Sequence, residues 1–373
     1  MFVVMFGGVD GDGLEALMRR ALEASALDLL ETALESGRFV DCVLVADRPP
    51  LGRLPEGARL LLDDGTQPFQ FGQRLTAVVA ESGATRFVYA GAGAAPLLEA
   101  AELEALAQGV AGADTVCVTN NFYSADLFGL HPAELLGRLD PWPSADNGVP
   151  RALKEQLGVE VREIARTTAT QFNLDSPIDL LAIALAGAGG PRLRAVLDAW
   201  APDTSRVRAV AWKLTDRHAE VLIAGRANSR AWRYLEQETA CRVRLLAEER
   251  GMTAAGRDSD GSARSLLGQL VEAVGAERCF GELVPQLCDA AFIDMRPLLA
   301  HLGIHASRAD RFAADLGDSE AIEDPRLRAL IAAVVASPVP IVLGGHSLIA
   351  ASLQLLNQWV WDEHDRIAAG NEG

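Results

Sequence analysis

Gly7 and Gly8 form a glycine-rich turn between the apolar run 2–6 and a long amphipathic run. A turn of this kind between a strand and a helix exposes backbone N–H groups, which can hold a phosphate or the edge of a base. The turn matches neither the GxGxxG fingerprint nor a phosphate-binding loop that ends in GK[ST]. Asp10 and Asp12 follow it and would repel a phosphate, so a flexible surface turn is the alternative interpretation.

A second turn of very small residues, 91–95, follows the apolar run 86–90 and precedes Pro96. Its glycines, Gly91 and Gly93, would let a ligand approach the backbone closely. We take both as candidate nucleotide-binding residues. None of the side chains in this turn can hold a hard cation such as Mg²⁺, because such ions need oxygen ligands.

Two further turns carry polar side chains that could bind a ligand. The amides of Asn120 and Asn121 could hydrogen-bond a substrate, although the simpler interpretation is that they satisfy the backbone of a turn. Residues 225–229 contain Asn228 and Ser229, and either of them would serve as the N-cap of the next helix. An anion site that uses the guanidinium fork of Arg226 is the alternative interpretation of this segment.

Ser347 follows Gly344, Gly345 and His346 after an apolar run, and this order resembles a nucleophile elbow. An elbow needs a glycine two residues after the serine, where Ile349 stands here. It also needs an acid and a histidine on separate downstream elements. A serine hydrolase that uses Ser347 is therefore a remote alternative, and a tight turn between a strand and a helix is favoured.

Short apolar runs alternate with longer amphipathic runs in the first half of the chain. This order predicts a Rossmann-like α/β fold in which a mostly parallel sheet carries helices on both faces. The predicted strands are 2–6, 40–46, 58–62, 86–90, 115–119 and 159–164. The predicted helices are 14–36, 71–82, 97–108, 152–157 and 178–186, and residues 126–147 are predicted to be loop-rich.

Residues 187–191 contain three glycines and a proline, which favours a domain boundary. We therefore predict a first domain over 1–187 and a second, smaller α/β domain over 192–373. In the second domain, 208–214 and 219–223 are predicted to pair as a hairpin. Its other predicted strands are 241–247, 290–293 and 340–343, and its predicted helices are 229–239, 266–274, 298–302, 327–336 and 348–361.

Three more segments stand in the order found in GT-A-type nucleotidyltransferases. Arg20-Ala21-Leu22 lies where that family has Lys-Ala-Leu or Lys-Pro-Leu, and Asp63-Asp64-Gly65 follows the third predicted strand. The segment 173–180, Asn-Leu-Asp-Ser-Pro-Ile-Asp-Leu, is similar to the family's Asp-hydrophobic-Asp-Thr-Pro-Glu-Asp-Leu. On these motifs, residues 1–187 resemble the molybdenum-cofactor guanylyltransferase-like NTP transferases, with the phospholactate guanylyltransferases as relatives.

The resemblance implies that an NTP or nucleotide-sugar, or another small phosphorylated ligand, lies against Gly7 and Gly8. It also implies that Arg20 faces the triphosphate and that Asp64 joins the nucleotide site. Asn173 or Asp175 would complete a Mg²⁺ site in which a phosphorylated substrate attacks the α-phosphorus.

The turn that in the family carries the main Mg²⁺-binding aspartate is Gly93-Ala94 in this chain. Loss of that ligand is expected to cost orders of magnitude in rate, because Mg²⁺ neutralises the charge that develops in phosphoryl transfer. We therefore predict a nucleotidyltransferase-like protein whose catalysis is weak or lost, and we assign no catalytic residue.

Composition excludes several other classes of function. The chain has 373 residues and a formal net charge of −17, which argues against nucleic acid and anionic membranes as partners. It has no apolar run of about 18 residues, so we expect no membrane span and a cytoplasmic location. Its five cysteines form no CxxC pair and are predicted to be buried, reduced thiols.

Trp359 and Trp361 give the last predicted helix an apolar face together with Leu355 and Leu356. Core packing is the first interpretation of this face, and a homodimer interface is the second, because large aromatic side chains are enriched at interfaces. The alternative function is therefore a non-catalytic scaffold or regulatory protein that acts through oligomerisation.

Overall fold

The structure is a computed structural model that describes residues 1–63, 65, 68–252 and 255–371. Asp64, one of the predicted nucleotide-binding residues, lies outside the described residues. The chain forms two compact units. The first unit comprises Met1–Asp10, Arg19–Leu174 and Gly189–Ala199, and the second comprises Gly11–Met18, Asp175–Ala188 and the described residues from Trp200 onward. The chain passes between the units at several points, one of them between Ala188 and Gly189, and the predicted domains 1–187 and 192–373 stay a prediction.

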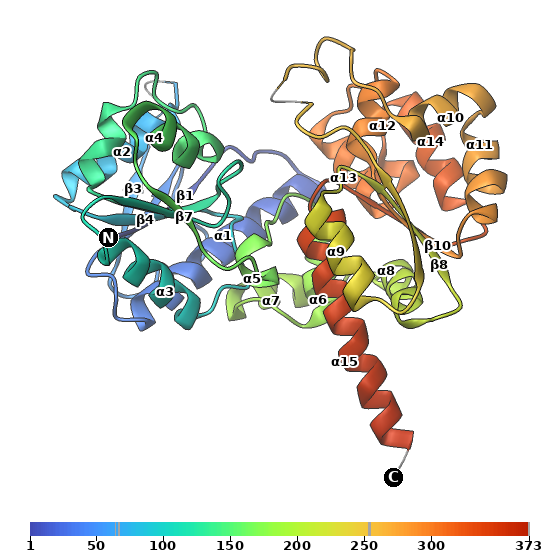
Figure 1. The fold of residues 1–373 in the computed structure, drawn as a ribbon, viewed down its shortest axis with the longest axis horizontal. Helices are drawn as coiled ribbons and strands as arrows, with labels where there is room; N and C mark the ends of the chain where they lie inside the picture. The colour runs from blue at the N-terminus through green and yellow to red at the C-terminus, as the bar shows by residue number, and fades with distance from the viewer. Residues whose placement is uncertain (64, 66–67, 253–254, 372–373) are drawn as a thin grey trace. The chain divides into compact units, whose positions relative to one another are not determined.

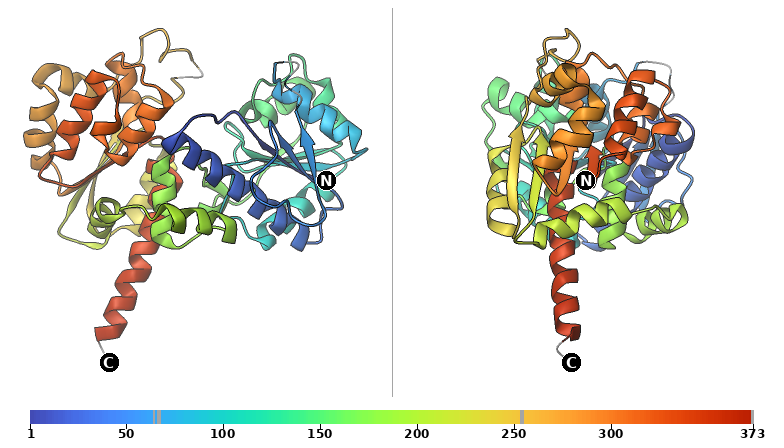
Figure 2. Two further views of the ribbon diagram at one scale, coloured as in Figure 1. Left: turned by 180° about the vertical axis from the view of Figure 1, so that it is seen from behind. Right: turned by 90° about the vertical axis from the view of Figure 1, so that its right-hand side faces the viewer.

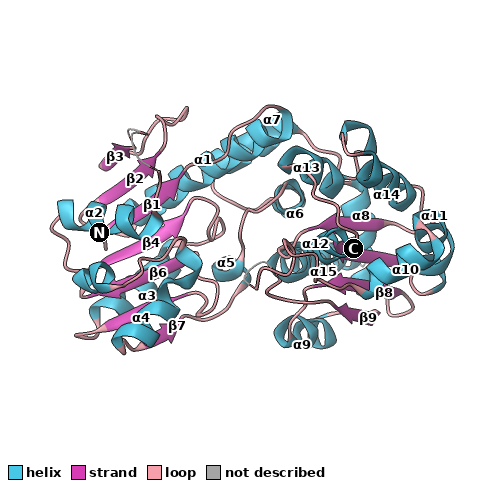
Figure 3. Cartoon of the chain, turned by 90° about the horizontal axis from the view of Figure 1, so that it is seen from above, coloured by secondary structure: helices cyan, strands magenta, loops and turns pink. Residues whose placement is uncertain are grey.

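The described part of the first unit contains a seven-stranded sheet with the order β3-β2-β1-β4-β6-β5-β7. Figure 3 shows these strands side by side. All of them run parallel except β6, which is antiparallel to both of its neighbours. The strands are β1 (Phe2–Phe6), β2 (Cys42–Ala46), β3 (Ala58–Leu62), β4 (Phe87–Gly91), β5 (Val116–Thr119), β6 (Leu127–His131) and β7 (Val161–Glu163).

Helices cover both faces of this sheet, as Figures 1 and 2 show. Because successive side chains of a strand point to opposite faces, Phe2 and Val4 of β1 join one hydrophobic cluster and Val3 joins another. The first cluster includes side chains of α1 and α3, and the second includes side chains of α2 and α4. The helices of this unit are α1 (Gly13–Glu35, whose first residues belong to the second unit), α2 (Phe71–Glu81), α3 (Ala100–Ala111), α4 (Val149–Leu157), α5 (Thr168–Gln171) and α7 (Pro191–Trp200).

The second unit contains, within the described residues, a four-stranded parallel sheet with the order β11-β10-β8-β9. The strands are β8 (Glu220–Gly225), β9 (Arg242–Ala247), β10 (Ala290–Asp294) and β11 (Ile341–Gly344). The helices are α6 (Pro177–Ala186), α8 (Ser205–Trp212), α9 (Ser229–Glu238), α10 (Leu266–Val274), α11 (Ala276–Arg278), α12 (Met295–His301), α13 (Arg308–Leu316), α14 (Pro325–Val335) and α15 (Leu353–Asn371). The short helical turn η7 (Leu348–Ser352) precedes α15.

These elements confirm the predicted α/β class with a mostly parallel sheet and a second sheet. The second unit is not smaller in length than the first, although its sheet has fewer strands. The five cysteines are free and buried, as predicted, and burial raises the pKa of the Cys117 thiol to about 12.

The hairpin predicted over 208–223 is wrong. Its first half is the end of helix α8 and a 3₁₀ turn, Lys213–Thr215. Val207, Val210, Ala211 and Leu214 are all buried, and their spacing of three and four residues is helical rather than alternating. The prediction that this segment is apolar is correct, but the predicted alternating period is wrong.

The loop-rich segment predicted over 126–147 contains strand β6, which the sequence analysis missed. Leu127, Phe128 and Leu130 are fully buried between two neighbouring strands. Gly129 is required there, because a Cβ atom would lie 2.4 Å from Val110 Cγ2. A continuous apolar run bounded by Asp126 and Pro132 was the available signal.

The apolar face of α15 packs within the second unit. The Trp359 ring lies 6.5 Å from that of Trp212, and Arg208 stacks over it. Trp361 donates from its indole Nε1 to the carbonyl oxygen of Glu238. Core packing therefore explains this face, and a homodimer stays a prediction.

In the described chain no single helix is long and apolar enough to cross a membrane, and only α6 and α7 taken together meet that test by length and composition.

Candidate functional site

The strand order of the first sheet has a switch point between β1 and β4. From β1 the chain proceeds to β2 and β3 on one side and then returns to place β4 on the other side. In open parallel sheets, ligands bind at such a switch point, because the loops that follow the two strands diverge there. Gly7 and Gly8 follow β1, and Gly91 ends β4.

A cavity of about 940 Å³ lies at this edge. Gly7 and Gly8 line it, as do residues that follow β2 and β3 and residues of α2. The cavity wall also includes an exposed aromatic ring, that of Phe69, whose side chain is 60% exposed. The volume lies within the range of about 300–1,000 Å³ that is usual for small-molecule sites.

Carboxylates and their partners determine the charge of this cavity. Asp47 accepts a hydrogen bond from the backbone N–H of Gly8 at 3.2 Å. Asp63 pairs with Arg74 at 2.6 Å. Burial raises the pKa of Asp47, whereas the hydrogen bonds from Gly8 and Arg19 and the charges of nearby arginines lower it. The lowering effects are larger together, so the pKa lies below its usual value. Carboxylates accept hydrogen bonds, so this wall suits ligand groups that donate them, such as base amino groups and ribose hydroxyls.

Tyr89 and Asp146 form a buried pair in the same cavity wall. The Tyr89 hydroxyl donates to Asp146 Oδ2 at 3.0 Å. Burial raises the pKa of Asp146, although Tyr89 and a backbone N–H oppose this effect, and burial together with Asp146 raises the pKa of Tyr89. A Cβ atom at Gly91 would lie 3.6 Å from the Tyr89 hydroxyl oxygen and 3.6 Å from Asp146 Oδ2. Gly91 therefore stands beside this pair, although it does not line the cavity itself, and its role in nucleotide binding stays a prediction.

Arg20 does not line this cavity. It lines a separate cavity of about 580 Å³, together with Glu23, Arg53 and Arg192. The neighbouring residue of α1, Arg19, is closer to the Gly7–Gly8 turn: it donates to the carbonyl oxygen of Val9 at 3.0 Å. One position along a helix turns a side chain by about 100°, which explains why the two arginines face different surroundings.

Gly93 lies in a packed turn and not in the cavity wall. A Cβ atom there would lie 2.9 Å from Leu22 Cδ2 and 3.0 Å from Asn173 Oδ1. The next residue, Ala94, is 1% exposed and forms an isolated β-bridge with Asn173. The position at which the family would place a metal-binding aspartate is thus filled by the chain itself.

The structure does not test the predicted Mg²⁺ site, Asn173 or Asp175. Asn173 pairs with Ala94 in the isolated β-bridge, and the backbone N–H of Asp175 donates to Asp179. No group of three or more His, Cys, Asp or Glu side chains in the described part of the chain could hold a metal ion. Binding of Mg²⁺ stays a prediction, and no chemical step is derived through it.

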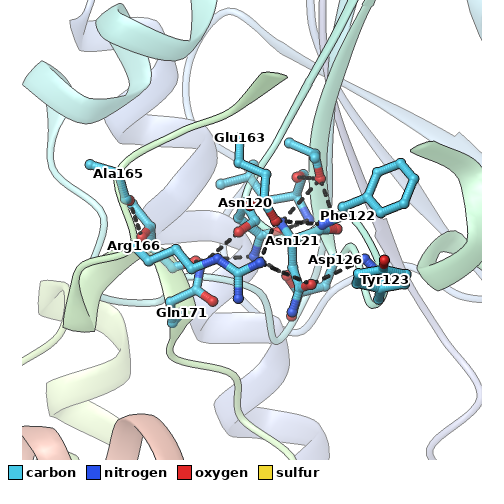
Figure 4. A network of polar contacts seen from close by, with 12 residues as sticks. Asn120, Asn121, Phe122, Tyr123, Asp126, Glu163, Ala165, Arg166 and Gln171 are labelled. Atoms are coloured by element: carbon cyan, nitrogen blue, oxygen red, sulfur yellow. Dashed lines mark hydrogen bonds and ion pairs between the residues drawn. The ribbon is translucent and has the colours of Figure 1, made fainter. Parts of the chain in front are cut away.

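Asn120 and Asn121 lie in a network of polar contacts at the carboxyl end of β5 (Figure 4). Asn120 donates from Nδ2 to the carbonyl oxygen of Thr170 at 3.0 Å and also to Asp126. Asn121 Oδ1 accepts from the backbone N–H of Tyr123 at 3.1 Å. Asn120 is 3% exposed, so its amide holds neighbouring segments together, which agrees with the simpler interpretation of these amides.

Ser347 is also held by contacts within the chain. It is 6% exposed, and its hydroxyl donates to the buried carboxylate of Asp179 at 2.9 Å. A nucleophilic serine instead donates to a histidine that serves as its base. The geometry of Ser347 is that of a structural hydroxyl.

Of the two N-cap candidates, Asn228 caps α9, since its Oδ1 accepts from two backbone N–H groups.

The cavity wall contains four polar residues that were not predicted from the sequence: Asp47, Arg74, Tyr89 and Asp146. Asp47 directly follows strand β2, and a polar residue at the carboxyl end of a parallel strand was a usable signal. Asp146 offered no such signal, because only the fold brings it beside Tyr89.

No protein-family model matches the chain, and no curated protein matches its sequence. Among solved structures, the chain is similar to a protein from Desulfovibrio desulfuricans G20 described as a nucleotide-diphospho-sugar transferase. The identity is 13%, over 53% of this chain and 93% of that chain, and the TM-score is 0.36. A cytidylyltransferase from Leptospira borgpetersenii has 10% identity over 53% of this chain and 92% of that chain, with a TM-score of 0.37.

The chain is also similar to CMP:2-keto-3-deoxy-manno-octonic acid synthetase in complex with CTP. The identity is 15%, over 53% of this chain and 99% of that chain, and the TM-score is 0.34. TM-scores this low carry no argument about family or activity, so function is inferred from the residues of this chain.

Proposed function

We propose that the first unit binds a nucleotide in the cavity at the carboxyl edge of its sheet, and that it lacks the metal site needed for efficient nucleotidyl transfer. The observation that carries this proposal is the position of the 940 Å³ cavity at the β1–β4 switch point, against Gly7 and Gly8. This is where the sequence motifs imply that an NTP or nucleotide-sugar lies.

The cavity suits the nucleoside part of such a ligand better than its phosphates. Asp47, Asp63 and Asp146 line it, and Arg74 is the one basic residue in its wall among the described residues. Three carboxylates disfavour a phosphate by like-charge repulsion, but they accept hydrogen bonds from a base and a ribose. The exposed ring of Phe69 offers a face on which a base can stack.

The packed Gly93–Ala94 turn supports the second part of the proposal. A Mg²⁺ ion needs several oxygen ligands, and the turn offers no side-chain oxygen. Nucleotide binding by this unit is therefore expected to be independent of Mg²⁺.

Calorimetric titration of the full chain with the four NTPs and with nucleotide-sugars tests this proposal. We expect at least one of them to bind, with the same Kd in the presence of Mg²⁺ and of a chelator. Replacing Phe69 by alanine should weaken that binding by roughly fivefold or more, because stacking on an aromatic ring contributes about 1–3 kcal/mol per base. The matched control is Trp232→Ala, which removes another exposed ring, on α9 of the second unit.

The absence of binding at millimolar concentrations of every nucleotide would contradict the proposal. Equal losses of affinity in the Phe69 and Trp232 variants would show that the ligand lies elsewhere. A Kd that falls by an order of magnitude when Mg²⁺ is added would overturn the second part alone.

A further inference from the structure

The second sheet has a switch point of its own, which the proposed function does not use. From β8 the chain passes through α9 to β9 on one side, and then returns to place β10 and β11 on the other. The loops that follow β8 and β10 therefore diverge at the carboxyl edge of this sheet, where open parallel sheets bind ligands.

Two charged residues begin these two loops, and they are paired. Arg226 follows β8, and Asp294 ends β10. Arg226 Nε lies 2.6 Å from Asp294 Oδ2, and Arg226 Nη2 lies 3.1 Å from Asp294 Oδ1. The Asp294 side chain is fully buried. Gly225 allows this approach, because its φ is +140° and a Cβ atom there would lie 2.3 Å from Asp294 Cβ.

A second buried pair lies beside the first. The backbone N–H of Arg296 donates to Asp294 Oδ1 at 3.1 Å, and Arg296 Nη2 donates to Asp315 Oδ2 at 2.7 Å. The turn that follows β11 passes next to this guanidinium, since a Cβ atom at Gly345 would lie 3.8 Å from Arg296 Nε. Residues that follow three of the four strands thus meet at one place.

The second pair leaves two buried polar atoms without a hydrogen-bond partner in the described chain. These atoms are Arg296 Nη1, a donor, and Asp315 Oδ1, an acceptor. A buried polar atom without a partner destabilises the fold, and native structures contain few of them. A ligand with an anionic oxygen for the first atom and a hydroxyl for the second would satisfy both.

Basic side chains exceed acidic ones around this point, although the whole chain is strongly acidic. Arg311 interacts electrostatically with Arg296, Asp315 and Glu15. His346 follows β11 and interacts with Arg226, Arg250 and Asp294. Burial and these arginines lower the pKa of His346 to about 4, so it is neutral at pH 7 and adds a hydrogen-bonding group without a charge. Arginines gathered in this way bind phosphate oxygens well, because the guanidinium fork matches their geometry.

We infer that the carboxyl edge of the second sheet binds a small phosphate monoester that carries a free hydroxyl group, with Arg226, Arg250 and Arg296 as its anion ligands. Asp315 accepts from the hydroxyl group. The site is independent of the nucleotide cavity, because all of its residues belong to the second unit.

Thermal unfolding of the full chain with inorganic phosphate as the probe tests the anion ligands. At about ten times its Kd, phosphate should raise the Tm of the second unit by roughly 3 °C over chloride at equal ionic strength. Arg250→Ala, at an exposed position, and Arg226→Lys, which keeps the charge but loses the two-point contact that orients the guanidinium on Asp294, should each weaken phosphate binding by about tenfold. Arg244→Ala is the matched control, since Arg244 is exposed on β9 and paired with Glu220, and it should leave the Kd unchanged.

Protection from phenylglyoxal, which modifies arginine, locates the bound phosphate. We expect phosphate to slow modification of Arg250 and to leave Arg244 unaffected, as read by mass spectrometry. No rise in Tm beyond the chloride control, or equal protection of both arginines, would overturn the inference. A larger rise in Tm with a dicarboxylate than with phosphate would overturn the assigned ligand class.

Discussion

Replacing Asp179 by alanine is expected to lower the free energy of unfolding of the second unit by about 3–5 kcal/mol at pH 5.5. The carboxylate lies in the first turn of α6 and is fully buried. Its Oδ2 accepts from the backbone N–H of Ser176 at 2.9 Å and from the Ser347 hydroxyl, and its Oδ1 accepts from the Ser352 hydroxyl at 2.7 Å. Alanine would leave these buried donors without a partner. Urea unfolding followed by tryptophan fluorescence measures the loss, since five of the six tryptophans belong to the second unit.

The loss caused by Asp179→Ala should become smaller as the pH rises. Burial raises the pKa of Asp179 from 3.8 to about 7 in the folded chain. The stability that the protonated form contributes is therefore complete below about pH 4 and is lost as the pH rises through 7, by up to about 1.4 kcal/mol per pH unit. As the pH rises, the wild type loses this contribution to its stability, whereas the alanine variant never has it. The control is Asp362→Ala, at an exposed position of α15 in the second unit. Equal effects of the two variants at pH 5.5 and at pH 8 would contradict the role of Asp179.

Placing an aspartate at Ala94 is expected to lower the free energy of unfolding of the first unit by about 3 kcal/mol or more, and added Mg²⁺ should not restore it. Ala94 is 1% exposed, and its backbone N–H donates to the carbonyl oxygen of Gly91 at 2.9 Å. A carboxylate there would be buried without a cation or a set of donors. Denaturant unfolding followed by hydrogen exchange of the first unit, with and without Mg²⁺, measures the effect.

Ala101→Asp is the matched control for this substitution. It adds the same charge at an exposed position in the first turn of α3, where the helix dipole favours an acid. We expect its stability to stay within about 0.5 kcal/mol of the wild type. If Mg²⁺ raised the stability of the Ala94 variant but not of the control, the turn would still be able to form a metal site, and the packing argument would fail.

The two units share a plan that neither the motifs nor the composition indicated. Each places its first strand inside the sheet, between the strand that follows it in the chain and a strand that comes later: β1 lies between β2 and β4, and β8 lies between β9 and β10. Each sheet therefore has one switch point. Around the first lie mainly carboxylates, and around the second lie mainly arginines, so we infer different ligand chemistry for the two edges.

The sequence by itself determined the elements with a strong local pattern. Strand β1 was predicted with its exact bounds, and α2 was predicted to within one residue, because apolar content, period and turn residues all agree there. Where the hydrophobic period is weak, the prediction is wrong: a strand was predicted for the last turns of α8, and a loop for β6. Local reasoning also fixed the N-cap of α9, since Asn228 needs only its own neighbours to act.

Tertiary structure alone decided which of the candidate residues meet. Gly7 and Gly8 line the cavity, but Arg20, Gly91 and Gly93 do not, because helix rotation and close packing depend on partners far away in the chain. Asp146 reaches Tyr89 across 57 positions, and Asp179 binds Ser347 across 168. The residue type determines which interactions a side chain can make. The partner of that side chain depends on long-range contacts formed during folding, and such contacts have no local pattern in the sequence.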